Sequence, residues 1–128
     1  MERLTTKEEE IMQIIWNLGK CYVKDIIEQL PDPKPPYTTV SSIVRILEGK
    51  EFVGHAAYGN THQYYPLVAK EDFRKKTLKS LVKDYYDNSF KSVVSFLIEE
   101  EKLTSEDVAE LTRIIKKNKK EKMGNDNE

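Results

Sequence analysis

The chain has a single cysteine and no long apolar run. Cys21 has no partner within the chain for a disulfide, which agrees with a reducing compartment. No stretch approaches the roughly 18 apolar residues that a membrane-spanning helix needs. The N-terminus is too rich in charged side chains to be a secretory signal. These absences exclude a disulfide-stapled secreted protein and a membrane-spanning protein, and we expect the chain to remain in the cytoplasm.

The sequence also lacks an excess of positive charge. Its formal net charge is -1 at pH 7, and residues 1–68 hold more acidic than basic side chains. Domains that bind nucleic acids are usually basic, so the overall charge argues mildly against such a partner. Any affinity for DNA must therefore come from the local placement of cations.

No motif for catalysis or for metal binding is present. A glycine-rich phosphate loop, a His-Glu-x-x-His motif, a Gly-x-Ser-x-Gly motif and a close cysteine pair are all missing. His55 and His62 fall on neighbouring predicted strands, but no third ligand accompanies them. A polar surface or phosphate contacts explain these histidines more simply than a metal site does. We expect no enzyme activity, no cofactor and no bound metal.

Helical periodicity, by contrast, is plain in the first part of the chain. Apolar residues recur at helical spacing over residues 4–18 and again over 23–30. Thr6 and Glu9 match a capping box at the start of the first helix, and Gly19 is expected to end it. A short strand is expected between the two helices, at residues 21–23.

A stiff connector and a third helix follow. Four of the five prolines fall within residues 31–36, which cannot be helical. Residues 38–50 are predicted to be helical, with Thr38 or Thr39 as the N-cap. The inward positions of this helix are apolar, whereas the outward ones are mostly short Ser and Thr side chains. A merely solvated face more often carries Glu and Lys, so this face suits close approach to another surface.

Two alternating segments, 52–58 and 61–65, surround Gly59-Asn60 and predict a β-hairpin. Two helices, a connector and a hairpin in this order have the layout of a winged helix-turn-helix. In that motif the second helix enters the major groove of DNA, while the first crosses the backbone. Arginine suits guanine or phosphate, and lysine suits phosphate. The predicted DNA contacts are Lys24, Thr38, Thr39, Ser41, Ser42, Arg45, Lys50, His62 and Tyr64.

From residue 70 onward the pattern remains helical. Three helices are expected, with Asn88 and Thr104 as caps of the second and third and residues 116–128 as a charged tail. These helices carry more apolar side chains than they can enclose, so a second copy of the chain is the natural cover. The predicted dimerisation residues are Leu78, Leu81, Tyr85, Phe90, Val94, Leu97, Leu111, Ile114 and Ile115.

The expected fold is therefore mainly α with a small β-hairpin. A winged helix-turn-helix would occupy residues 1–68, and a three-helix dimerisation region would occupy residues 69–128. Four segments within this layout carry a family resemblance: LTTKEEEIMQIIW at 4–16, VKDIIEQL at 23–30, YTTVSSIVRILEGKEFV at 37–53 and QYYPLV at 63–68. A weaker similarity continues over residues 90–115.

On these residues the chain resembles the penicillinase repressor family, which includes methicillin-resistance repressors and copper-responsive relatives. The resemblance implies a homodimeric repressor on a palindromic operator. In the β-lactam-responsive branch, a membrane sensor-protease system triggers cleavage before a phenylalanine, which weakens the dimer and releases DNA. Residue matching puts this bond at Ser95-Phe96, with serine where the family usually has asparagine.

Other departures from the family pattern imply different operator contacts. Ile46 stands at the family's arginine near the end of the recognition helix, and Arg45 comes one place earlier. Glu51 stands where a glycine commonly follows that helix, and the wing arginine is replaced near Asn60. The copper branch uses C-terminal cysteine motifs, which this chain does not have.

The leading hypothesis is a dimeric, sequence-specific transcriptional repressor. The alternative is a winged-helix protein-interaction module without DNA binding, which the near-neutral N-terminal half and the missing wing arginine support. Substituting Arg45 and Ser42 discriminates between them, because only a DNA reader would then lose its operator. A small enzyme is a third class, but no nucleophile with its base can be assembled from the sequence.

Overall fold

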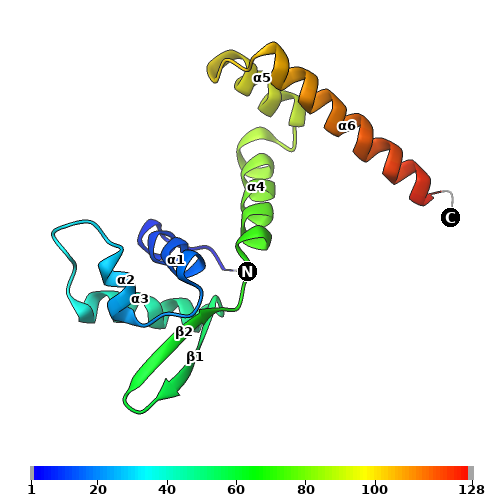
Figure 1. Cartoon of the computed structure of the whole chain (residues 1–128). Coiled ribbons are helices and arrows are strands. Elements are labelled where there is room, and N and C mark those ends of the chain that lie inside the picture. Colours follow the sequence, from blue (N-terminus) through cyan, green and yellow to red (C-terminus); the bar gives the residue numbers. More distant parts are fainter. Residues whose placement is uncertain (1, 127–128) are drawn as a thin grey trace. The chain divides into compact units, whose positions relative to one another are not determined.

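The computed structural model describes the backbone of residues 2–126 and the side chains of residues 2–120. Six helices and one two-stranded antiparallel sheet make up this part of the chain (Figure 1). The mainly helical fold with a small hairpin, a winged helix followed by three helices, is thereby confirmed. None of the described helices combines the length and the apolar character needed to cross a bilayer.

The first helix, α1 (Thr6–Leu18), is capped one residue earlier than the sequence predicts. Thr5 is the N-cap, and its hydroxyl oxygen accepts a hydrogen bond from the Glu8 backbone N–H at 3.2 Å. Both Thr5-x-x-Glu8 and the predicted Thr6-x-x-Glu9 match the capping pattern. The first pair is used because Glu8 is buried and also held by a distant lysine, as described below.

The second helix begins where the sequence predicts but ends earlier, and the short strand predicted before it is not formed. Helix α2 (Val23–Glu28) is two residues shorter than predicted, and Gln29 is its C-cap. In place of a strand over 21–23, Cys21 makes a single β-bridge to Tyr64. This bridge joins the helical part of the domain to the hairpin through the hydrogen bonds Cys21 N–H to Tyr64 O at 2.9 Å and Tyr64 N–H to Cys21 O at 2.7 Å.

The third helix, α3 (Tyr37–Gly49), begins directly after the last proline of the connector. The predicted N-caps Thr38 and Thr39 are therefore wrong, because both lie inside the first turn. Pro36 is the N-cap, with an extended backbone (φ -61°, ψ 149°) and a carbonyl that accepts the Thr39 N–H at 3.1 Å. Proline is tolerated at this place, since it lacks only an N–H group that would have no carbonyl partner within the helix.

Strands β1 (Val53–Tyr58) and β2 (Thr61–Pro66) form the predicted hairpin, called the wing below. The pairing is antiparallel and in register from Val53 opposite Pro66 to Tyr58 opposite Thr61. Gly59 opens the two-residue turn with φ 63°, a conformation that glycine adopts without a Cβ clash. The predicted first strand began one residue too early, because the paired register starts at Val53 and Phe52 lies just before it, with its side chain fully buried in the core.

The chain divides into two compact units, and the boundary falls after Thr77, inside helix α4 (Lys70–Tyr86). The sequence predicts a boundary after residue 68, at the end of the wing. The start of α4 belongs to the first unit because Phe73 packs against Trp16 and Phe52, with ring centroids 5.3 Å and 5.7 Å away. The Trp16 indole N–H also donates to the carbonyl of Val68 at 2.8 Å.

The first unit has a well-sealed core. Its buried side chains come from α1, α2, α3 and the hairpin, and they form one continuous cluster. The most deeply buried of them are Met12, Ile15, Cys21, Ile26, Val40, Val44, Leu47, Phe52 and Val53. This cluster fixes the orientation of α3 relative to α1 and the hairpin.

The second unit holds the rest of α4 together with α5 (Phe90–Glu100) and α6 (Ser105–Asp126). Ser89, not the predicted Asn88, caps α5, because Asn88 has a left-handed backbone with φ 61°. The predicted cap at Thr104 is confirmed by its reciprocal hydrogen bonds with Asp107, both 3.1 Å. The predicted charged tail is helical as far as Asp126, and its last two residues lie outside the described residues.

Candidate nucleic-acid interface

One side of α3 is exposed and made of small or positively charged side chains. Thr38, Ser42 and Arg45 recur at i, i+4 and i+7 and are all exposed, so they form one row along the helix. The opposite side carries Val40, Val44 and Leu47, which are buried in the core and hold the row outward. We call the three exposed residues the reading face. Threonine and serine keep the backbone close to any surface that this face meets, and Arg45 can extend from its end.

The hydroxyl group of Ser42 already has a partner within the helix. It donates to the backbone carbonyl of Thr38 at 2.8 Å. In this rotamer the Ser42 oxygen can still accept a hydrogen bond, for instance from the amino group of a base, but its proton is not available to a phosphate. The arrangement therefore favours a base contact over a backbone contact at Ser42.

Two other predicted contacts lie on the flanks of the reading face. Thr39 is exposed and lines a cavity of about 280 Å³ between α1, the proline connector and α3. Ser41 is only half-exposed and lies on the opposite flank. Glu48, two helical turns further along, shares that flank and contacts the Nδ1 atom of His55 on β1.

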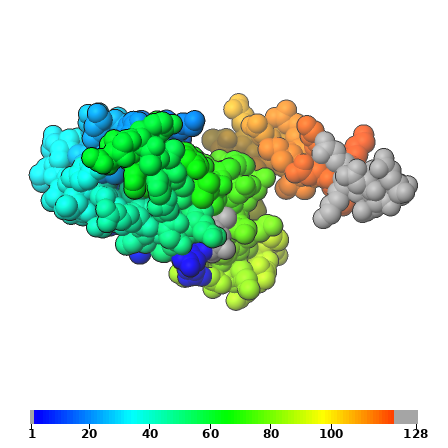
Figure 2. Space-filling model, turned by 90° about the horizontal axis from the view of Figure 1, so that it is seen from below, coloured from blue at the N-terminus to red at the C-terminus, as the bar shows by residue number. Residues whose placement is uncertain are grey.

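The wing carries a pair of stacked imidazole rings. His62 on β2 lies over His55, with ring centroids 4.2 Å apart and planes 10° from parallel. Through the contact between His55 and Glu48, this pair is tied to the flank of α3, and Figure 2 shows the wing in green lying against α3 in teal. Within the described residues, no group of three histidine, cysteine or acidic side chains could hold a metal ion.

Tyr64 is not part of the exposed surface, which corrects the sequence-based expectation. Its residue is 3% exposed and belongs to the core cluster. Burial, followed by the charge of Glu48, raises the pKa of its phenol above the usual value. The reason for this position is the bridge to Cys21, which draws this part of β2 under the helices. Tyr58 and Asn60, at the tip of the hairpin, are exposed instead.

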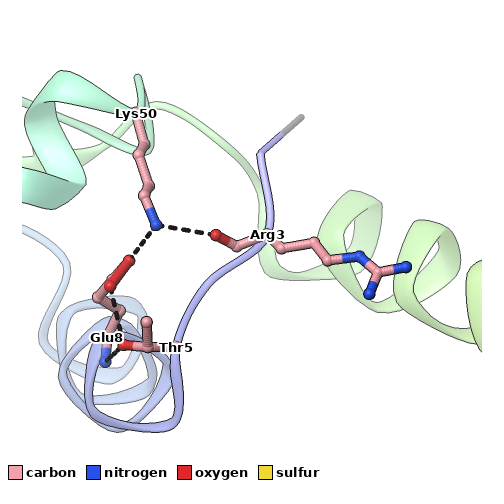
Figure 3. Close-up of polar contacts among 4 residues, drawn as sticks. All are labelled: Arg3, Thr5, Glu8 and Lys50. Carbon is pink, nitrogen blue, oxygen red and sulfur yellow. Dashed lines mark hydrogen bonds and ion pairs between the residues drawn. The ribbon is translucent and has the colours of Figure 1, made fainter.

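The two predicted phosphate-binding lysines are in different situations. Lys24 is exposed in the first turn of α2. Lys50, the C-cap of α3, turns toward the N-terminal end of α1, where its ammonium group contacts Glu8 and donates to the carbonyl of Arg3 at 2.9 Å (Figure 3). This pairing differs from the expectation of a free cation beside the wing.

Two residues missing from the predicted interface are also exposed on α3. Tyr37, the first residue of the helix, is 56% exposed, and Ile46 is 48% exposed. Tyr37 could have been predicted as part of this helix, because it directly follows Pro36 and helices often start next to a proline. The only local sequence feature that points to Glu8 is the Thr5-x-x-Glu8 capping pattern. The adjacent Thr6-x-x-Glu9 pattern fits the start of α1 equally well, so the contact between Glu8 and Lys50 could not be predicted from it.

The second unit exposes much apolar area. Of the nine predicted dimerisation residues, Leu97 is half-buried. The other eight are exposed: Leu78, Leu81, Tyr85, Phe90, Val94, Leu111, Ile114 and Ile115. Ser95 and Phe96 lie in the middle of α5, and Phe96 is 43% exposed.

Comparison with known proteins agrees with this geometry. The sequence profile of the penicillinase repressor family matches residues 4–117. The chain belongs to this family. Its members are transcriptional repressors and not enzymes, so the chain is a repressor. Burial raises the pKa of the Cys21 thiol to about 11, as expected for a structural cysteine in an apolar core.

Relatives of the repressor match it over nearly its whole length. The methicillin resistance regulatory protein MecI of Staphylococcus aureus (strain N315) is 30% identical over 115 residues, which cover 89% of this chain and 94% of MecI. The penicillinase repressor of Bacillus licheniformis is 23% identical over 122 residues, covering 94% of each chain. A solved structure of the CopR repressor, 28% identical, covers 52% of this chain and 99% of its own, with a TM-score of 0.44.

Proposed function

We propose that the repressor is a homodimer that binds a palindromic DNA operator with one α3 helix per half-site. The observation that carries this proposal is the reading face: Thr38, Ser42 and Arg45 in one exposed row, beside the wing and backed by a sealed core. An α-helix with short side chains fits the major groove of DNA, where Arg45 can pair with guanine and Ser42 with a base amino group.

Support for a dimer comes from the second unit. Val82 is the only one of its described residues that is buried, while many large apolar side chains of α4, α5 and α6 are exposed. So many exposed large apolar side chains are typical of a surface that another protein covers. A second copy of the chain would cover it and form a twofold-symmetric contact in which each copy presents the same surface.

A dimer would also give the reading face useful affinity. Two recognition helices would enter successive major grooves about 34–36 Å apart. Once the first half-site is occupied, binding of the second becomes intramolecular and is strengthened by its high effective concentration. Separation of the two copies would therefore release DNA without any change in the reading face.

Proteolysis in α5 is the proposed route to that separation, with a membrane sensor-protease system as the partner. The family resemblance assigns the bond to Ser95-Phe96. A bond inside a helix is cut only after local unfolding, and α5 offers little resistance because none of its residues is buried. Cleavage there would detach α6 and part of the apolar surface from the DNA-binding unit.

The proposed function is tested by gel shift on the DNA upstream of the repressor's own gene. The wild-type chain should bind in a sequence-dependent and salt-sensitive way. Arg45→Ala should weaken binding by roughly 5- to 150-fold per half-site, the range of a bidentate base contact. Ser42→Ala should weaken it by roughly 2- to 10-fold, because it removes a single hydrogen bond. Arg74→Ala is the matched control, because Arg74 is an exposed arginine paired with Glu71 on α4 and belongs neither to α3 nor to the wing.

Sedimentation of the same samples distinguishes the two candidate functions. Dimers of the Arg45 and Ser42 variants should remain intact while operator binding falls. A wild-type dimer that binds no DNA even at low salt would contradict the proposal and support a protein-interaction module, which the excess of acidic side chains in residues 1–68 favours.

A further inference from the structure

The ammonium group of Lys50 lies at the centre of a small polar network (Figure 3). Its Nζ contacts a carboxylate oxygen of Glu8 and donates to the carbonyl of Arg3 at 2.9 Å. The other carboxylate oxygen of Glu8 accepts from the hydroxyl of Thr5 at 2.8 Å. We call these groups the Lys50 network. It connects the C-terminal end of α3 to the N-terminal end of α1, more than 40 residues away in sequence.

We propose that Lys50 is a positioning residue, which sets the angle of the recognition helix and of the wing instead of contacting a DNA phosphate. This inference rests on the proposed function, since it assigns Lys50 a role in the DNA binding of α3. It is carried by the enclosure of the ion pair: the side chains of Lys50 and Glu8 are only 21% and 7% exposed. Two of the three N–H groups of the amine are directed at these partners, so at most one is left for a phosphate, on a side chain with little exposed surface.

The position of Lys50 in the chain explains why its anchoring matters. Lys50 is the C-cap of α3, and the strand β1 begins three residues later at Val53. Helix α3 is about 20 Å long at 1.5 Å per residue. A tilt of about 5° around Lys50 would therefore move the Thr38 end by roughly 1.7 Å, which exceeds the range of distances that a hydrogen bond tolerates.

The charges of the network also favour positioning over phosphate binding. The hydrogen bond from Lys50 lowers the pKa of the Glu8 carboxyl, against the opposing effect of burial. Glu8 is thus ionised at neutral pH, and the charge of Lys50 is neutralised inside the protein. An amine in this state would release few counterions from DNA, so it should add little to the salt dependence of binding.

The two possible roles of Lys50 predict different results in operator titrations at several salt concentrations. We compare the full-length wild type with Lys50→Met, Glu8→Gln and Lys24→Met, where Lys24 is the exposed counterpart. Removal of a phosphate contact lowers the slope of log affinity against log salt by about 0.9 per contact. For Lys50→Met we expect an unchanged slope and at least a tenfold weaker affinity for the operator. For Lys24→Met we expect a lower slope.

Glu8→Gln gives a test in which the expected sign is reversed. Loss of a negative charge from a DNA-binding unit should strengthen binding if only the long-range field matters. The proposal predicts weaker operator binding, with no loss of affinity for non-operator DNA, because the number of phosphate contacts is unchanged. A partly unfolded variant would instead lose affinity for operator and non-operator DNA equally. The Glu8→Gln/Lys50→Met double variant leaves no unpaired buried charge, so it should behave like Lys50→Met.

The results that would overturn the inference are distinct from failure of the proposed function. A lower salt slope for Lys50→Met, or operator binding by Glu8→Gln as tight as that of the wild type, would show that Lys50 does not act by positioning. Absence of operator binding by the wild type would instead refute the proposed function itself.

Discussion

The two units of the repressor differ in how many of their apolar side chains are buried. In the first unit, helices from three parts of the sequence and the base of the wing enclose a core in which Met12, Ile15, Ile26, Val44, Leu47 and Phe52 have no exposed surface. In the second unit, helices of similar or greater length leave most of their large apolar side chains exposed, and only Val82 is buried among the described residues.

This difference matches the roles proposed for the two units, which are DNA contact for the first unit and dimerisation for the second. Helices are stabilised mainly by the packing of an apolar face, and isolated ones are marginal in water. The first unit satisfies this requirement within one chain, so its reading face can be held in a fixed shape. The second unit would satisfy it only against another surface. The stability of the second unit should therefore depend on protein concentration, and that of the first should not.

The largest effect is expected from a cavity in the first unit. Phe52→Ala should lower the free energy of unfolding of this unit by about 3–5 kcal/mol, the range for truncation of a buried phenylalanine, because Phe52 is fully buried and packs on Phe73. Trp16, the only tryptophan, lies in the first unit, so its fluorescence during urea unfolding measures the change. Leu67→Ala is the control, since Leu67 is 57% exposed. A loss of similar size in both variants would contradict a sealed core.

A smaller effect, confined to the second unit, is expected from a charge on its apolar surface. Ile114→Asp should raise the dissociation constant of the dimer by at least about 10-fold, because Ile114 is 49% exposed within one chain and each copy would lose about half of the roughly 1.5–3 kcal/mol that full burial of an isoleucine provides. Analytical ultracentrifugation measures this change. The Trp16 emission should stay that of a folded first unit.

Ala109→Asp provides the matched control for this charge. It adds the same carboxylate to α6 on the side away from Val108, Leu111 and Ile115. Dimerisation should be nearly unaffected. If both variants dissociate equally, or if neither does, the exposed apolar surface of α6 is not the dimer contact.

Local signals allowed much of the fold to be predicted from the sequence. Helical periodicity, four prolines in one connector and a Gly-Asn turn each act over a few residues, and they located the three N-terminal helices and the hairpin within one or two residues at most ends. The family resemblance added the general function. The outward positions of Ser42 and Arg45 followed from the period of α3 alone, because its apolar side was unambiguous. Thr38, in contrast, was expected at the N-cap, and only the structure places it in the same row.

The errors come from contacts between distant parts of the chain. Two overlapping capping patterns, at Thr5 and Thr6, are equivalent in local terms, and the choice depends on a lysine at position 50. Tyr64 lies two residues after His62 on β2, so the alternation of the strand predicts that it is exposed on the same face. The bridge to Cys21 places it in the core instead. Neither contact leaves a periodic signal, so reasoning from local sequence misses both.

The smallest effect is expected at the C-terminal end of α3. Glu51 stands there in place of the glycine that commonly follows this helix in the family. Glu51 has φ 66°, and the hydrogen bonds Phe52 N–H to Leu47 O at 2.9 Å and Glu51 N–H to Glu48 O at 3.0 Å form a Schellman motif around it. A left-handed backbone costs a residue with a Cβ atom about 1–2 kcal/mol, and glycine gives back about 0.5–1 kcal/mol through its freer unfolded chain. Glu51→Gly should therefore stabilise the first unit by about 0.5–1 kcal/mol.

Two comparison variants turn this small gain into a test of the two-unit description. Glu51→Ala removes the same charge but keeps the Cβ atom, so it should not raise the urea midpoint reported by Trp16. Asp87→Gly relieves a similar strain in the second unit, where Asp87 has φ 50°, and it too should leave that midpoint unchanged. If Asp87→Gly raises the urea midpoint reported by Trp16 as much as Glu51→Gly does, the two units unfold together. The proposed division of DNA contact and dimerisation between the units would then have no counterpart in their stabilities.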